Sequence, residues 1–229
     1  MGVSRFGRRY HPSAMRLGSR SARLLVGLCL LVLSVACGGS DEVTEVGPAP
    51  EPASGGAPWP APSDPLERTV EAGLEPATRE FLDYHVHAHL DIFVNGEPVV
   101  VPGGIGINID DPAVKTLEGQ TGTAYGGIDP PCEEPCISPL HTHEPDGVLH
   151  TESAVDHPHT LGEFFIEWGV ALDEECVGGY CNPEASIQVF VDGDLDRGNP
   201  ADIQLVDLRE IAIVIGTPPD DIPSGFPGS

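Results

Sequence analysis

The stretch 85–94 constrains the fold of this chain more strongly than any other part of the sequence. Apolar residues occupy its even positions and mostly polar residues its odd positions, which is typical of a β-strand that buries one face. Asn95-Gly96 follows directly and is typical of a tight hairpin turn, so the chain should return through residues 98–101. The polar face of this first strand is predicted to carry His85, His87, His89 and Asp91.

A second group of elements is predicted from residue 139 onward. Residues 144–147, Glu-Pro-Asp-Gly, separate two short strand-like stretches and indicate another hairpin. Thr160 and Glu163 have the spacing of a capping box, which marks the start of a helix. The predicted elements are strands at 139–143, 148–152, 187–191 and 211–215, with the helix between the second and the third. This order predicts an α+β fold, mainly antiparallel β with one capped helix and β-grasp-like; a cupin-like or other β-sandwich is the alternative.

The N-terminal part of the chain differs in composition from the rest. More than half of the 11 basic residues precede an apolar run at 24–36, which is shorter than the about 20 residues that a bilayer-spanning helix needs. This arrangement predicts that residues 1–36 are a signal peptide. The run ends in Ser-Val-Ala-Cys-Gly-Gly, which resembles a bacterial lipobox. We therefore expect Cys37 to be lipidated and to anchor the protein on the extracytoplasmic side of the cell envelope, at the periplasmic face or the outer membrane; the alternative is ordinary cleavage that leaves a free thiol.

Residues 37–80 are rich in Pro, Gly, Ala and acidic side chains and contain little that could form a core. We expect them to be a disordered tether, followed by a single histidine-rich domain over 81–229. The chain has 36 acidic residues and a net charge of −25. This charge argues against a nucleic-acid partner and against electrostatic attachment to anionic lipids, so the membrane is expected to be a partner through the lipid alone.

The remaining cysteines form two close pairs. They are Cys132, Cys136, Cys176 and Cys181. In an exported protein an even number of cysteines favours disulfides, and several connectivities are possible. We expect local bridges within each pair. The alternative is a zinc site of four thiolates.

All but one of the 9 histidines lie between His85 and His159. Alternate side chains on one face of a strand stand about 6 to 7 Å apart, so two imidazoles in an H-x-H motif can converge on one ion. A four-residue turn at 144–147 would pair His141 with His150. The candidate metal ligands are therefore His141, His143 and His150, completed by one or two of His85, His87 and His89. His157 and His159 flank a proline before the helix and are better explained as non-ligands.

Imidazole and carboxylate ligands suit a divalent transition metal, with Zn(II) or Cu(II) favoured and Fe or Ni as alternatives. The only methionines, Met1 and Met15, lie in or before the predicted leader, which argues against soft Cu(I) handling. The leading hypothesis is a lipoprotein that scavenges, buffers or delivers Zn or Cu, with no protein partner specified. One alternative is a metal-dependent hydrolase or oxygenase in which Glu152 assists a bound water as a catalytic residue. The other is a structural module that the metal makes rigid.

Four ordered blocks of the sequence, HAHLDIFVNGEPVVVPGGIGI, LHTHEPDGVLHTES, TLGEFFIEWG and IVIGTPPDDIPS, cover residues 83–224 with their connections. In these blocks the chain resembles an uncharacterised family of exported prokaryotic histidine-rich proteins. The resemblance implies the domain boundaries and the association of the histidine motifs, and it implies no particular reaction. The H-x-H motifs are also superficially similar to those of cupins, but the downstream glutamate and second-motif spacing of a cupin are missing.

Overall fold

The described part of this computed structural model comprises residues 55–228. The predicted signal peptide, the lipidation candidate Cys37 and the first part of the predicted tether lie outside the described residues. The main element is a seven-stranded sheet. Its strands are β1 (Tyr84–Val94), β2 (Glu97–Val99), β5 (Leu140–His141), β6 (Val148–Ser153), β9 (Ile187–Val191), β10 (Asp194–Asp196) and β11 (Arg209–Ile215).

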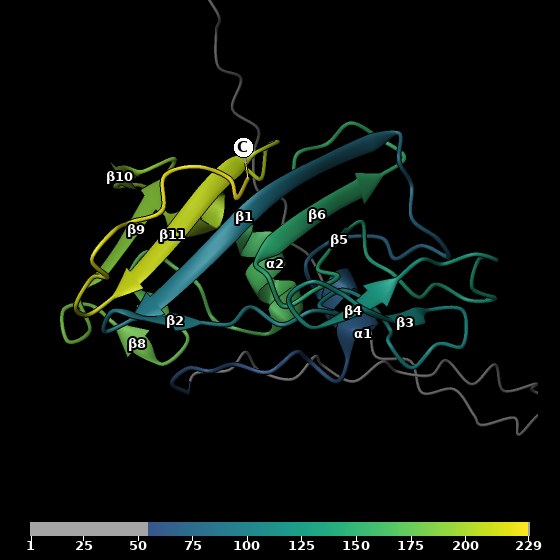
Figure 1. The fold of residues 1–229 in the computed structure, drawn as a ribbon, viewed down its shortest axis with the longest axis horizontal. Coiled ribbons are helices and arrows are strands. Elements are labelled where there is room, and N and C mark those ends of the chain that lie inside the picture. Colours follow the sequence, from purple (N-terminus) through teal and green to yellow (C-terminus); the bar gives the residue numbers. More distant parts are fainter. Residues whose placement is uncertain (1–54, 229) are drawn as a thin grey trace, which may run out of the picture. The chain divides into compact units, whose positions relative to one another are not determined.

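The sheet has the strand order β10-β9-β11-β1-β6-β5, and β2 pairs with β1 as the predicted hairpin. Strand β1 lies between β11 and β6 (Figure 1) and is parallel to β11. Every other strand pair of this sheet is antiparallel. This arrangement agrees with the predicted α+β class and its mainly antiparallel sheet.

Two α-helices and one 3-10 helix accompany the sheet in the described residues. They are α1 (Pro65–Glu71), α2 (Leu161–Trp168) and η1 (Pro200–Asp202). The predicted capping box is confirmed, because the Thr160 side chain accepts a hydrogen bond from the Glu163 N–H at 3.2 Å and the Glu163 carboxylate accepts one from the Thr160 N–H at 2.6 Å. Gly169 ends the helix in the left-handed conformation, with φ of 73°. None of the helices within residues 55–228 has the length and apolar content that a bilayer-spanning helix requires.

The two faces of the sheet have different neighbours. The even-numbered residues Ala88, Leu90 and Ile92 of β1 are buried with Phe164 and Trp168 of α2 in one core cluster. Because side chains alternate along a strand, the odd-numbered histidines of β1 lie on the opposite face. The fold therefore places the histidine motifs on the side of the sheet that α2 does not cover.

The packed part of the chain begins earlier than the predicted boundary near residue 81. Trp59 is 3% exposed and contacts Trp168 edge to face, with ring centroids 5.8 Å apart. Helix α1 also contacts α2. A single tryptophan in a Pro-rich stretch gave no periodic signal, but it buries enough apolar surface to fix this segment on the core.

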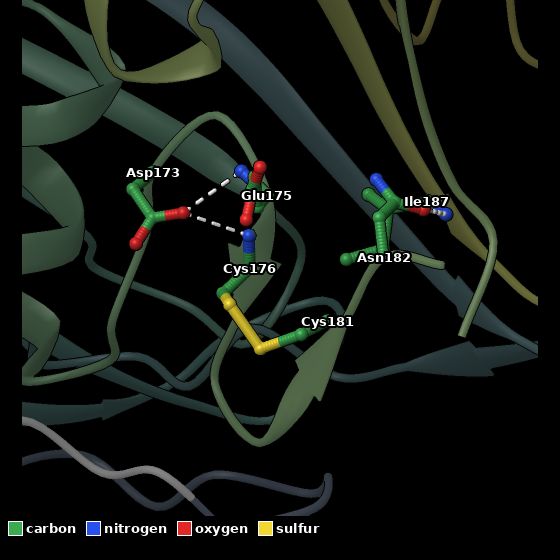
Figure 2. Close-up of a disulfide and its surroundings, with 6 residues drawn as sticks. All are labelled: Asp173, Glu175, Cys176, Cys181, Asn182 and Ile187. Atoms are coloured by element: carbon green, nitrogen blue, oxygen red, sulfur yellow. Dashed lines mark hydrogen bonds between the residues drawn. A yellow bond between two sulfur atoms is a disulfide. The ribbon is translucent and has the colours of Figure 1, made fainter. Parts of the chain in front are cut away.

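Two small hairpins lie outside the main sheet. Strand β3 (Lys115–Glu118) pairs with β4 (Thr123–Gly126), and β7 (Cys176–Val177) pairs with β8 (Tyr180–Cys181). The predicted local disulfides are confirmed as Cys132–Cys136 and Cys176–Cys181. Figure 2 shows that the Asp173 carboxylate accepts hydrogen bonds from the N–H groups of Glu175 and Cys176. These bonds join the loop before the second disulfide to the start of β7.

Replacing Thr160 with alanine should lower the free energy of unfolding by about 1 kcal/mol, because α2 loses the acceptor for an N-terminal N–H group. Urea denaturation of Thr160→Ala beside wild type measures this loss. Thr116→Ala on the exposed strand β3 is the matched control and should change stability by less than about 0.5 kcal/mol. Equal stability of Thr160→Ala and wild type would contradict the role of the cap.

Candidate metal centre

Three neighbouring strands bring the histidine motifs together. In the strand register His87 of β1 lies opposite His150 of β6, and His150 lies opposite His141 of β5. The second of these pairings is the one predicted from the turn at 144–147. One step along the strands, His85 lies opposite Glu152. These side chains share one face of the sheet, and together with His143 they form a cluster of five imidazoles and one carboxylate.

Backbone carbonyls fix the ring orientations of His141 and His143. The Nδ1 of His141 donates a hydrogen bond to the Ser138 carbonyl at 2.8 Å, and the Nδ1 of His143 donates one to the Tyr125 carbonyl at 2.5 Å. Since both Nδ1 protons are committed, the Nε2 atoms present lone pairs, and these two atoms lie 3.2 Å apart. Two facing lone pairs repel, so a positive charge, either a proton or a metal ion, is needed between them.

Gly126 makes room for the His143 ring. Its φ is 144°, and a Cβ at this position would lie 2.7 Å from Nδ1 of His143. A side chain other than hydrogen would therefore push the imidazole out of its place. The short hairpin of β3 and β4 thus supplies both the carbonyl that orients His143 and the space that the ring occupies.

Glu152 lies at the centre of the cluster and is 6% exposed. Its Oε1 is 3.2 Å from Nε2 of His85, 3.5 Å from Nδ1 of His150 and 3.8 Å from Nε2 of His143. Its Oε2 is 3.9 Å from Nε2 of His141, is buried and has no hydrogen-bond partner. A buried carboxylate oxygen without a donor is costly unless a cation compensates it.

His85 and His87 form the second H-x-H pair of the cluster. Their Nε2 atoms lie 2.9 Å apart, and the rings meet edge to face. The His85 side chain is 35% exposed. The ligand atoms of His85, His87 and His150 all lie within 4.8 Å of one another, as do those of His141, His143, His150 and Glu152.

The protonation of the imidazoles follows from burial and from Glu152. Burial lowers the pKa of His141 well below its usual value and also lowers the pKa values of His150 and His87. Burial would lower the pKa of His143 too, but Glu152 and the Tyr125 carbonyl outweigh it and raise that pKa. Burial would raise the pKa of Glu152, yet the surrounding imidazoles lower it strongly, so this carboxylate is ionised at neutral pH. His141, His150 and His87 thus favour the neutral form and Glu152 the ionised form, which are the forms that bind metals.

The structure places His89, the sixth predicted ligand, in a separate group with Asp91 and Glu210. Its Nδ1 is 2.9 Å from Oε2 of Glu210, and its Nε2 is 2.9 Å from the Asp146 carbonyl. The Asp146 carbonyl can only accept, so Nε2 of His89 donates that hydrogen bond. Burial would lower the pKa of His89, but Glu210 outweighs it and raises that pKa. The group of His89 shares no residue with the cluster around Glu152.

His157 and His159 also lie apart from the cluster, near the start of α2. They form a group with Glu163, whose Oε2 is 3.5 Å from Nδ1 of His159. Because Glu163 already accepts a hydrogen bond from Thr160 in the capping box, this group belongs to the helix start. The structure thus keeps these two histidines separate from the cluster of five histidines and Glu152.

The cluster opens to solvent through a shallow hollow of about 340 Å³. Its lining includes His87, His143 and His150 together with the acidic side chains of Glu144 and Asp146. A cation can therefore reach the imidazoles directly, and the carboxylates at the rim favour its approach.

Sequence reasoning did not find three groups that define these sites. The Ser138 and Tyr125 carbonyls orient imidazoles but are backbone atoms, so residue type carries no signal for them. Glu210 stands immediately before a predicted strand, and its register with His89 depends on the parallel pairing of β1 and β11. Comparisons with protein families, with curated proteins and with solved structures found no match for this chain.

Proposed function

We propose that this protein binds a transition metal ion, Zn(II) or Cu(II), and scavenges, buffers or delivers it at the cell envelope. The observation that carries the proposal is the pair of Nε2 atoms of His141 and His143, which face each other at 3.2 Å with both Nδ1 protons committed to carbonyls. Two nitrogens bound to one ion at about 2.0–2.1 Å stand roughly 2.9–3.4 Å apart, so this spacing fits a shared ion.

The donor set supports this choice of metals. Five imidazoles and one carboxylate suit Zn(II) and Cu(II), with Ni(II) and Fe(II) as further candidates. The cysteines of the described domain are joined in disulfides and are not available as thiolate ligands. The buried Oε2 of Glu152, which has no hydrogen-bond donor, supplies a charged ligand for the ion.

The geometry of the site supports binding and exchange of a metal ion more than it supports catalysis by Glu152. The Glu152 carboxylate is 6% exposed and lies among four imidazoles, with its Oε1 3.2 Å from the nearest ring nitrogen, Nε2 of His85. Glu152 therefore suits the role of a ligand. The wide, acidic rim of the hollow also suits an ion that enters and leaves.

A metal-dependent hydrolase or oxygenase is a second candidate, because a cavity of about 600 Å³ reaches Glu152 from another side. Its lining includes Phe81, Val155 and His159. An organic substrate of moderate size has room there. Turnover of a model ester by the zinc-loaded protein, lost in Glu152→Gln, would favour this candidate, and the absence of turnover of esters, amides and phosphoesters would count against a hydrolase.

We also propose that the protein is exported and anchored through a lipid on Cys37. The two disulfides of the described domain support an oxidising, extracytoplasmic location. Labelling of cells with a radioactive fatty acid should mark the wild-type protein and leave Cys37→Ser unmarked. Equal labelling of both proteins, or of neither, would contradict the anchor.

A β-grasp-like fold is the finer assignment that we propose for the sheet. Strands β6, β1, β11 and β9 are neighbours in this order in the sheet, with β1 parallel to β11. Along the chain the order is β1, β6, α2, β9 and β11. This order supports a β-grasp core in which residues 95–147 form a large connection between the first two strands. A two-sheet sandwich, as in cupins, has less support because the described core strands lie in one sheet.

Isothermal titration calorimetry of the metal-free protein with Zn²⁺ and Cu²⁺ tests the metal proposal. We expect His143→Ala to bind these ions at least about 100-fold more weakly than wild type. Loss of a metal ligand should reduce affinity more than loss of a group that only orients a ligand. His157→Ala is the matched control and should bind as wild type does. Unchanged affinity in His143→Ala, or no binding by wild type, would refute the proposal.

A further inference from the structure

We propose that the histidine cluster holds two metal ions side by side, with Glu152 as the carboxylate that bridges them. This inference rests on the proposed metal binding and adds the number of ions and their arrangement. The His141–His143 pair would hold one ion, and the His85–His87 pair the other.

The two H-x-H pairs are separate and similarly spaced. Their Nε2 atoms lie 3.2 Å apart in His141 and His143, and 2.9 Å apart in His85 and His87. Both distances fall in the range of roughly 2.9–3.4 Å expected for two nitrogens on one ion. The pairs belong to two different groups of mutually close ligand atoms, and His150 is the residue common to both groups.

Glu152 lies beside both pairs. Its Oε1 is 3.2 Å from Nε2 of His85, and its Oε2 is 3.9 Å from Nε2 of His141. Its Oε1 is also 3.8 Å from Nε2 of His143. A carboxylate whose oxygens reach both pairs can bind two ions at once, as in protein sites whose ions are about 3.5–4 Å apart. Such a bridge also compensates Oε2, which is buried and lacks a hydrogen-bond donor.

His150 stands between the pairs on the same face. Its ring centroid is 4.5 Å from that of His87 and 4.4 Å from that of His143. Its Nδ1 is buried without a hydrogen-bond partner and lies 3.5 Å from Oε1 of Glu152. A fifth imidazole at this position can complete the ligands of either ion.

Carboxylates around the cluster offset the charge of a second cation. Asp207 accepts a hydrogen bond from the His87 backbone N–H at 3.2 Å, beside one pair. Glu144 and Asp146 line the hollow beside the other pair. One bridging carboxylate alone would leave most of the positive charge of two divalent ions uncompensated. Acidic groups on both sides therefore lower the electrostatic free energy of binding two ions.

The number of bound ions tests this inference. The full chain is dialysed to equilibrium against excess Zn²⁺, and zinc per chain is measured by inductively coupled plasma mass spectrometry. We expect about two ions in wild type and in the control His157→Ala, and about one in His85→Ala/His87→Ala. The last variant replaces partly exposed side chains, and circular dichroism checks that it is folded.

The possible outcomes separate this inference from the proposed function. One ion in wild type would overturn the bridged pair and leave the metal proposal standing, whereas no ion would overturn both. Two ions that persist in His85→Ala/His87→Ala would place the second ion elsewhere and overturn the inference. In Cu(II)-loaded wild type, electron paramagnetic resonance should show a coupled pair with a half-field signal; two independent Cu(II) signals would also overturn it.

Discussion

Saturating Zn²⁺ should raise the melting temperature of the wild-type protein by about 8–16 °C. An ion that binds only the folded state, at about 1,000 times its dissociation constant, stabilises that state by about 4 kcal/mol. For a domain of this size each kcal/mol raises the melting temperature by about 2–4 °C. The gain is large because the facing Nε2 atoms of His141 and His143 and the buried Oε2 of Glu152 come together only in the folded chain.

Differential scanning calorimetry of the metal-free and zinc-saturated protein measures this gain. His141→Ala/His143→Ala should lose most of the gain, and the single variant His143→Ala serves where complete burial of His141 makes the double variant unstable. Mg²⁺ is the matched ion control, because it binds imidazole poorly and should leave the melting temperature nearly unchanged. An equal gain with Mg²⁺, or in His143→Ala, would mean that Zn²⁺ acts on the acidic surface and not on the cluster.

Replacing Glu167 with glutamine should stabilise the metal-free protein at pH 8 by on the order of 3–5 kcal/mol and change its stability little at pH 5. Glu167 lies on α2 and is 0% exposed. Burial raises the pKa of this carboxyl from 4.5 to about 8, and the nearby Ser138 and Thr69 hydroxyls offset the shift only in part. Between these pH values the unfolded chain has lost a proton that the folded chain keeps, so the free energy of unfolding of wild type falls as pH rises.

Urea denaturation at pH 5, 6.5 and 8 in the presence of a chelator tests this prediction. The difference between wild type and Glu167→Gln should grow with pH, since all other titrating groups are common to both proteins. Glu118→Gln, at an exposed position of β3, is the control and should follow wild type. Parallel pH profiles of wild type and Glu167→Gln would show that Glu167 is not a buried neutral acid.

Local sequence signals predicted the second hairpin and the helix start correctly. The Glu-Pro-Asp-Gly turn fixes the register that pairs His141 with His150, and Thr160 with Glu163 forms the capping box. Both depend on residues within a few positions of each other. The local disulfides also follow from short spacings in the chain.

Local signals could not predict which of His85, His87 and His89 join the cluster. Opposite His85 and His87, strand β6 supplies Glu152 and His150, whereas opposite His89 it supplies Val148. At the level of His89 the polar neighbour is Glu210 of β11. The H-x-H-x-H motif is uniform, so only the long-range pairing of β1 with β6 and β11 separates the first two histidines from the third.

The point at which the packed region begins could not be predicted from composition, for a related reason. Composition separates polar, Pro-rich segments from apolar ones, but it does not detect one large side chain that packs at a distance. Trp59 contacts both Trp168 and Tyr180 edge to face. These contacts join residues far apart in the sequence, so the packed region includes part of the stretch that composition assigns to the tether.

Elemental analysis of the protein purified without a metal-affinity tag is the most direct test of the central claim that the cluster around Glu152 binds a transition metal. Wild type and His157→Ala should retain zinc or copper in amounts comparable to the protein. His141→Ala/His143→Ala, and the milder His143→Ala, should retain much less. Equal metal content in the cluster variants and wild type, or no transition metal in wild type even after reconstitution with Zn²⁺ and Cu²⁺, would contradict the claim.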